Sequence, residues 1–169
     1  MFKKIFISML ALLAVVQIDA LQAKKKEVQT WKYEVEPIEM VGAKGTVSFK
    51  VWSYGRTAKE ATDQAFRNGV HAVIFKGIPN TTRVAGFKPL VEKLSVMDEN
   101  QAFFDTFFAE GGEYARFITH STTGQVGAGD VLKVNNKEYK VGVTVTVSQS
   151  QLRERLEDEK IVKSMTSIF

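Results

Sequence analysis

The chain of 169 residues contains no cysteine, which excludes disulfides, a thiol nucleophile and lipid attachment at a mature N-terminal Cys. Its 23 Lys and Arg and 19 Asp and Glu give a net charge of +4, a mild excess that does not indicate binding to nucleic acid. A chain of this length suits one compact domain, whose stability must come from a hydrophobic core.

The N-terminus has the residue order of a secretory signal peptide. Lysines precede the apolar stretch 5–16, and Ala20 and Ala23 are small residues at which cleavage can occur. The stretch is shorter than the roughly 20 residues that a membrane-spanning helix requires, and a buried N-terminal helix is the alternative. We therefore expect residues 1–23 to be removed and residues 24–169 to be exported as a single domain without a transmembrane span.

Two early segments, TWKYEVEPI and GTVSFKVWSYG, alternate between apolar and polar residues, as strands of a half-buried antiparallel sheet do. The residues that share the apolar face are Trp31, Tyr33 and Val35 in the first segment and Val47, Phe49 and Val51 in the second. Pro37 cannot donate a ladder hydrogen bond, so the first strand is expected to lie at an edge of the sheet or to end there.

Residues 57–77, TAKEATDQAFRNGVHAVIFKG, are predicted to form a helix that begins at a capping box of Thr57 and Glu60 and ends at Gly77. Its smallest residues recur at helical spacing and so form one stripe, which consists of Ala58, Ala61, Ala65, Gly69 and Ala72. Gly69 costs about 1 kcal/mol of helix propensity, which close packing can offset. We therefore expect this helix to lie flat on the sheet.

Residues 78–97 carry turn signals and are predicted to form a long connection with one helical turn. A second helix is predicted to begin at Asp98, with Gln101 as its capping partner, and to end at Gly111 and Gly112. Its phenylalanines form one broad stripe that is interpreted as core, the alternative being a groove for a ligand or partner: Phe103, Phe104, Phe107 and Phe108.

The remainder of the chain predicts three strands and a helix. EYARFITHST, residues 113–122, alternates as a strand, and DVLKV and EYKVGVTVTVS are expected to form a hairpin across Asn135 and Asn136. The last strand is the clearest in the chain, because its apolar residues all point one way: Tyr139, Val141, Val143, Val145 and Val147. A final helix is expected, with Ser148 or Ser150 as its cap, Leu152 and Leu156 facing inward, and an ion pair between Arg153 and Glu157.

The sequence indicates no catalytic, cofactor or metal site. His71 and His120 have neither a metal-ligand spacing nor a cysteine beside them, and both are interpreted as ordinary surface or interface residues. GQVGAG at residues 124–129 lacks the glycine order of a nucleotide-binding turn and is interpreted as a flexible loop. The acidic residues have no spacing that selects a general acid and base. We therefore expect a protein that is not an enzyme.

Trp52 and Tyr54 lie opposite the apolar face of the second predicted strand. If the sheet is covered on one side only, both are exposed, and exposed aromatic residues favour a partner interface. The alternative is a second layer of the same protein over that face, formed by the C-terminal helix or by residues 78–97. The candidate interaction surface comprises Trp52, Tyr54 and the loop around Arg83 to Phe87.

The order of these segments resembles a known family. A strand that ends at Tyr54-Gly55 is followed by TAKEATDQAFRNGVHAVI, by an aromatic-rich segment, and by YARFITHSTTGQVGAGDVLKVNNKEYKVGVTVTVSQSQLRERLED. This order is similar to that of the N-terminal domain of flagellar assembly protein T and of related small envelope lipoproteins, over about residues 45–157, although the chain has no lipobox cysteine. The resemblance implies an α+β domain of a bacterial envelope that is not an enzyme and acts through protein–protein contact.

We expect an α+β fold with an antiparallel or mixed sheet of four to five strands, an Ala-striped helix and a Phe-rich helix packed on it, a C-terminal helix, and a core at about residues 30–160. The favoured function is that of a structural or assembly component in the periplasm or at the cell surface of a diderm bacterium. It would bind other envelope proteins or a second copy of itself, without a cofactor. The alternative is a periplasmic binder of a small apolar or glycan ligand, with Phe103 and Phe107 lining its pocket.

Overall fold

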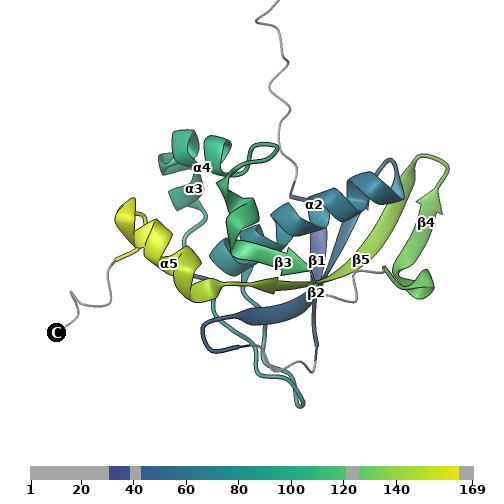
Figure 1. Cartoon of the computed structure of the whole chain (residues 1–169), viewed down its shortest axis with the longest axis horizontal. Coiled ribbons are helices and arrows are strands. Elements are labelled where there is room, and N and C mark those ends of the chain that lie inside the picture. The colour runs from purple at the N-terminus through teal and green to yellow at the C-terminus, as the bar shows by residue number, and fades with distance from the viewer. Residues whose placement is uncertain (1–30, 39–42, 121–125, 164–169) are drawn as a thin grey trace, which may run out of the picture. The chain divides into compact units, whose positions relative to one another are not determined.

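The computed structural model describes residues 31–38, 43–120 and 126–163 (Figure 1). These residues form an α+β fold with a five-stranded antiparallel sheet and a C-terminal helix, which confirms the predicted fold class. The predicted signal peptide with its cleavage site, and Gly124 and Gln125 of the glycine-containing loop, lie outside the described residues.

The sheet consists of β1 (Tyr33–Pro37), β2 (Val47–Gly55), β3 (Ile118–His120), β4 (Val131–Asn135) and β5 (Glu138–Val147). The strand order is β1-β2-β5-β3, and β4 also pairs with β5. The long strand β5 therefore has β2 along one edge and both β3 and β4 along the other. β1 lies at the edge of this order and ends at Pro37, as expected for a residue that lacks a backbone N–H.

The odd-numbered residues of β2 and β5 form the inner face of the sheet, which carries the core. The register places Val51 opposite Val143 and Phe49 opposite Val145, so that branched and aromatic side chains meet across the strands. The predicted apolar stripe of the last strand is confirmed, because no surface is exposed on Val141, Val145 or Val147.

Helix α2 (Ala58–His71) lies across this inner face (Figure 1). Its small-residue stripe faces the sheet, and there is no exposed surface on Ala61, Ala65 or Ala72. A Cβ atom at Gly69 would lie 2.8 Å from Ile118 Cδ1 and 3.2 Å from Val145 Cγ2, closer than packed side chains approach without displacement. The glycine thus sets how near the helix axis comes to the strands, as predicted.

Both predicted ends of the helix are present, with one difference at each. Thr57 Oγ1 accepts the N–H of Glu60 at 3.1 Å, but the Glu60 carboxylate accepts the N–H of Arg56 at 3.0 Å, one residue before the partner that a capping box predicts. At the other end a π-helical turn (Ala72–Lys76) extends the helix, and Gly77, with φ 66°, donates its N–H to the carbonyl of Ala72 at 2.8 Å.

Two short helices, α3 (Ser95–Glu99) and α4 (Gln101–Phe107), stand where one helix beginning at Asp98 was predicted. That prediction is wrong because Asp98 lies inside α3, and Asn100 between the helices has non-helical backbone angles. The side-chain amide of Asn100 donates to the carbonyl of Val96 at 2.9 Å and helps to end α3 there. Three of the four phenylalanines in the stripe are core as predicted, with at most 2% of the surface exposed on Phe104, Phe107 and Phe108, and Phe103 is partly buried against the core.

Residues Glu113–Phe117 form a 3₁₀ helix, so the strand predicted for this segment begins only at Ile118. Tyr114 and Phe117 are both buried. Side chains three residues apart lie on one face of a 3₁₀ helix, which lets both rings reach the phenylalanine cluster. In a segment this short, burial of two aromatic rings prevailed over the alternating pattern.

Helix α5 (Gln149–Asp158) follows β5 directly. No surface is exposed on Leu152 or Leu156, and Arg153 Nη1 lies 3.2 Å from Glu157 Oε1, so both predictions for this helix are confirmed. Ser148 occupies the N-cap position, but its side chain makes no capping hydrogen bond.

Candidate functional site

The outer face of the sheet, opposite the core, carries two of the predicted interaction residues. Trp52 and Tyr54 both belong to β2 and are two positions apart, so their side chains project to the same side. The register places Glu34 of β1 and Gly142 of β5 on either side of Trp52, and Lys140 of β5 opposite Tyr54. Three strands thus bring aromatic, acidic and basic side chains together on one surface.

The indole ring of Trp52 rests on the backbone of β5. A Cβ atom at Gly142 would lie 3.0 Å from three carbon atoms of the ring, so any larger residue there would displace it. The indole Nε1 donates to Glu36 Oε2 at 2.7 Å. A glycine inside a strand commonly marks such a close approach, and here it fixes the orientation of the ring.

Tyr54, Glu34 and Lys140 form one hydrogen-bonded group. Tyr54 Oη donates to Glu34 Oε1 at 2.7 Å, and Lys140 Nζ donates to the two Glu34 oxygens at 2.8 and 2.9 Å. The hydrogen bonds from Lys140 and Tyr54 lower the pKa of Glu34, and the hydrogen bond to Glu34 raises the pKa of Lys140. Both groups are therefore ionised at neutral pH and attract each other.

Ammonium groups and aromatic rings alternate across this face. Lys32 Nζ lies 4.2 Å from the centroid of the Tyr54 ring, and Lys140 Nζ lies 5.6 Å from that centroid and 5.4 Å from the Trp52 centroid. Lys50 Nζ lies 5.5 Å from the Trp52 centroid on the other side. These distances permit cation–π attraction. We call Lys32, Tyr54, Lys140, Trp52 and Lys50 the cation–aromatic ladder.

Ion pairs hold both ends of the ladder. Lys32 Nζ lies 2.6 Å from Glu138 Oε1, and Lys50 Nζ lies 2.8 Å from Asp130 Oδ1. Pairs of this kind at a surface contribute little to stability one by one. Here they restrict long side chains to one arrangement, so that a partner would meet a surface with little side-chain entropy left to lose.

The two segments considered as a second layer over Trp52 and Tyr54 make their described apolar contacts with the core. Leu152 and Leu156 of α5 belong to the core cluster, as does Val91 of the connection after α2. Trp52 and Tyr54 are half-buried, and 56% of the Glu34 side chain is exposed. The ladder is therefore accessible at the surface of the described part of the chain.

Arg83 and Phe87 lie on the connection after α2 and take no part in the ladder. The ring centroid of Phe87 lies 5.7 Å from that of Phe49, so Phe87 packs against a core residue of the inner face. Arg83 is exposed on a loop in which the N–H of Gly86 donates to Asn80 Oδ1 at 2.7 Å. The candidate surface predicted from the sequence thus divides into two aromatic residues that lie together and two residues that do not join them.

His71 is buried in the core, so its interpretation as a surface or interface residue is wrong. Its ring stacks on Trp31 with centroids 3.7 Å apart, and its Nδ1 lies 2.7 Å from Tyr33 Oη. Burial lowers the pKa of His71 to about 3 and raises the pKa of Tyr33. Both groups are therefore neutral at physiological pH and form a polar pair inside an aromatic cluster. The side chain of His120 is outside what the structure describes.

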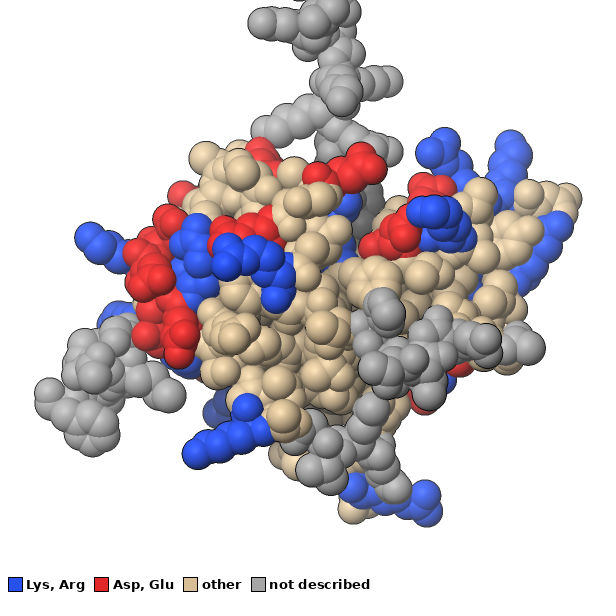
Figure 2. All heavy atoms as spheres, in the orientation of Figure 1, with Lys and Arg blue, Asp and Glu red and all other residues tan. Residues whose placement is uncertain are grey.

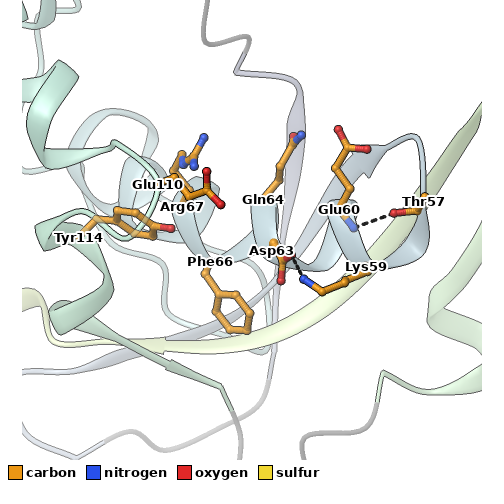
Figure 3. A pocket seen from close by; sticks show the side chains of 9 residues that line it. All are labelled: Thr57, Lys59, Glu60, Asp63, Gln64, Phe66, Arg67, Glu110 and Tyr114. Carbon is orange, nitrogen blue, oxygen red and sulfur yellow. Dashed lines mark hydrogen bonds and ion pairs between the residues drawn. The ribbon is translucent and has the colours of Figure 1, made fainter. Parts of the chain in front are cut away.

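A pocket of about 500 Å³ lies along the solvent side of α2 (Figure 3). Its lining residues are Thr57, Lys59, Glu60, Asp63, Gln64, Phe66, Arg67, Glu110 and Tyr114. Most of these are charged or polar, and acids and bases alternate along the helix, as in the pair of Lys59 and Asp63. Phe103 and Phe107, the residues expected to line a ligand pocket, do not line this one. Their rings stack on each other with centroids 5.3 Å apart.

Comparisons with protein-family models, with curated proteins and with solved structures found no match to this chain. Among residues 31–38, 43–120 and 126–163, no group of three or more His, Asp or Glu side chains is placed to hold a metal ion. None of the described helices has the length and apolar character required to cross a membrane.

The sequence pattern missed the partners of the two aromatic residues. Alternation places Trp52 and Tyr54 on the outer face, but only the strand register shows that Glu34 and Lys140 meet there. One signal was available: Gly142 interrupts a run of branched residues in an otherwise regular strand, which indicates a close approach by a large side chain.

Proposed function

We propose that the protein is an exported component of a bacterial cell envelope that acts through protein–protein contacts, and that the cation–aromatic ladder is its binding surface. The signal-peptide pattern of residues 1–23 supports export. The observation that carries the proposal is the contrast between the faces of the sheet, because the inner face is filled and the outer face holds ordered aromatic residues that no described layer covers.

The chemistry of the ladder favours a protein partner. Tyr and Trp are enriched at protein interfaces because they bury a large area and retain a polar atom. The two rings stand among three lysines and the acidic residues Glu34, Glu36, Asp130 and Glu138, so the surface offers both signs of charge within a short distance. Such a mixed surface suits a folded protein with its own charge pairs more than a polyanion.

The order of the ladder also supports binding by a preformed surface. Each lysine is held by a carboxylate, from β1, from β5 or from Asp130 just before β4, and each aromatic polar atom has an acceptor. Side chains that are already fixed lose less entropy on association than free ones, by about 0.5–1.5 kcal/mol for each. The partner would therefore dock against the ladder without rearrangement of the strands.

The proposal is tested by site-specific photo-cross-linking in the cells that produce the protein. A photo-reactive phenylalanine analogue replaces Tyr54, and in a matched control it replaces Lys59, whose side chain is 84% exposed on α2. We expect the variant at Tyr54 to form a cross-link to one envelope protein, and the variant at Lys59 to form none to that protein. Adding Lys140→Glu, which places a second carboxylate beside Glu34, should reduce the yield of the cross-link at position 54.

Three outcomes would contradict the proposal. If both positions capture the same proteins with equal yield, contact is not directed by the ladder. If fractionation places the mature protein in the cytoplasm, or if position 54 captures nothing while the variant folds as the parent protein does, the ladder is not a binding surface in the envelope. Circular dichroism of the purified variants checks the fold in each case.

A further inference from the structure

Four large apolar side chains are exposed in the described part of the chain, and they occur in two places. Leu94 is 69% exposed at the start of α3, whereas Val131, Leu132 and Val134 of β4 are 37%, 46% and 49% exposed. In Figure 1, β4 lies at one end of the long axis and α3 lies toward the other end. Exposed apolar groups that gather at a surface mark sites of association.

The two places carry opposite charge. Segment 92–99 around Leu94 holds Glu92, Asp98 and Glu99 with one lysine, Lys93. Segment 131–137 holds Lys133 and Lys137 and no acidic residue. In the described part of the chain, Glu92, Asp98, Glu99, Lys133 and Lys137 take part in no ion pair, so their charges are not neutralised locally. Figure 2 shows several Lys and Arg side chains at the end that carries β4.

We propose that the β4 hairpin of one copy of this chain docks on the acidic segment of the next copy, in a head-to-tail contact. We call the two surfaces the hairpin patch (Leu132, Lys133, Val134 and Lys137) and the acidic patch (Glu92, Leu94, Asp98 and Glu99). The two patches are complementary, because both present apolar groups and their charges are opposite.

A symmetric contact between two hairpin patches is disfavoured. β4 pairs with β5 along one edge only, so its other edge is free among the described residues. Antiparallel pairing of two β4 strands about their central residue would place Lys133 opposite Lys133 of the second copy, and like charges directly opposite are destabilising. Docking of the hairpin patch on the acidic patch brings opposite charges together and avoids this repulsion. A head-to-tail contact joins different surfaces, so each copy can bind two others and form open chains.

This inference does not depend on the proposed function, because neither patch includes a residue of the cation–aromatic ladder. Two charge-reversal variants test the patches one at a time. Both are purified in the mature form that the native cells produce. Lys133→Glu with Lys137→Glu blocks the hairpin patch, and Glu92→Lys with Asp98→Lys and Glu99→Lys blocks the acidic patch. All five side chains are exposed, and Trp52 and Tyr54 stay unchanged.

Sedimentation equilibrium measures the association. We expect the average mass of the wild-type protein to rise with concentration without stopping at a dimer, and to fall at high salt as the charges are screened. Each variant alone should associate at least about tenfold more weakly, since like charges then face each other. An equimolar mixture of the two reversal variants should associate again, because the native hairpin patch of one variant meets the native acidic patch of the other, and the two reversed patches also have opposite charges. A mixture that associates no better than either variant alone would contradict charge complementarity.

A second pair of variants tests the apolar contacts. Leu132→Asp with Val134→Asp disables only the hairpin patch, and Leu94→Lys disables only the acidic patch. Each should be monomeric alone, whereas their mixture retains one intact hairpin patch and one intact acidic patch and should form a complex that stops at one copy of each. A wild-type protein that stays monomeric at all concentrations, or a Leu94→Lys variant that still associates as the wild type does, would overturn the head-to-tail contact.

Discussion

The two faces of the central sheet are formed by alternate residues of the same strands, yet they hold opposite kinds of side chain. On the inner face, Val51 and Val145 meet the small-residue stripe of α2, and Gly69 allows the closest approach. On the outer face, Trp52 covers Gly142 and a network of charges surrounds it. A glycine enables close contact in both places: on the inner face it admits a helix, and on the outer face it admits one aromatic ring.

The two faces also differ in what holds their side chains in place. The inner contacts are mostly apolar and buried, and the side chain of Asn68 donates a hydrogen bond to Ser53 at 2.8 Å among them, so their strength depends mainly on volume and shape. The outer contacts involve charges that remain partly exposed, and they contribute order more than stability. Changes on the inner face should therefore alter the free energy of unfolding, whereas changes on the outer face should alter binding.

The largest expected effect concerns the buried histidine beside the inner face. His71 has a pKa of about 3 in the folded protein and an ordinary value near 6.5 in the unfolded chain. Between these values the unfolded chain binds the extra proton, so stability is present above pH 6.5 and is lost as pH falls toward 3. We expect the loss to reach about 4 kcal/mol.

The control for this prediction is His71→Gln, which can accept a hydrogen bond from Tyr33 but does not titrate in this range. Urea unfolding at a series of pH values measures both proteins. The difference between the two stability curves should widen in favour of the variant as pH falls from 6.5 to 3. Parallel curves would show that His71 is not buried in the neutral form.

The next largest effect is expected from Gly69→Leu. The added side chain would collide with Ile118 and Val145, so α2 would have to move away from the strands. We expect a loss of about 3 kcal/mol in the free energy of unfolding. Gly129→Leu serves as the control, because Gly129 is exposed and a Cβ there meets no atom within 4 Å. The two variants should differ clearly in melting temperature, and equal temperatures would place the small-residue stripe in solvent.

A smaller effect is expected on the outer face from Gly142→Ala. The added methyl group would press on three carbon atoms of the Trp52 ring and displace it from β5. We expect a loss of about 1 kcal/mol together with a change in tryptophan fluorescence. In a Trp31→Phe background the fluorescence reports Trp52 alone. An unchanged emission spectrum would mean that the ring does not rest on β5.

The smallest effect on stability is expected from Lys140→Met, which removes the ammonium group between the two rings. The ion pair with Glu34 is partly exposed, so the loss should be about 0.5 kcal/mol and should shrink at high salt. The pKa of Glu34 should rise toward its ordinary value, since the hydrogen bond from Lys140 is the main cause of its lowering. NMR titration measures this pKa. A pKa that stays unchanged would show that Lys140 does not hold Glu34.

Periodicity predicted those parts of the fold in which one pattern extends over many residues. In the alanine stripe of α2 and the valine stripe of β5 the spacing repeats several times, so a few irregular residues do not obscure the period. The segment Glu113–Phe117 is too short for this, because five residues do not establish a period. Its two rings, three residues apart, share a face in a helical turn but not in a strand. Asp98 resembled a helix cap, but the helix breaks at Asn100. This residue helps to end α3 through the hydrogen bond from its side chain to the carbonyl of Val96, which the sequence alone does not reveal.

The candidate site was predictable in part for a related reason. Trp52 and Tyr54 could be placed on one face from their own strand, since alternation is a local property. Their neighbours Glu34 and Lys140 come from strands that are distant in sequence, and which residues face each other is set by a register that one sequence does not reveal. His71 was misplaced because a polar residue gains a buried position only when a specific partner, here Tyr33, reaches it.

Hydroxyl-radical footprinting of the side chains tests the central claim most directly, because it compares both faces in one experiment. Labelling is measured in the intact cell envelope and in the purified protein. We expect Trp52 and Tyr54 to be labelled in the purified protein and protected in the envelope, while Phe107 stays unlabelled in both. Equal labelling of Trp52 and Tyr54 in the two preparations would contradict the outer face as a binding surface.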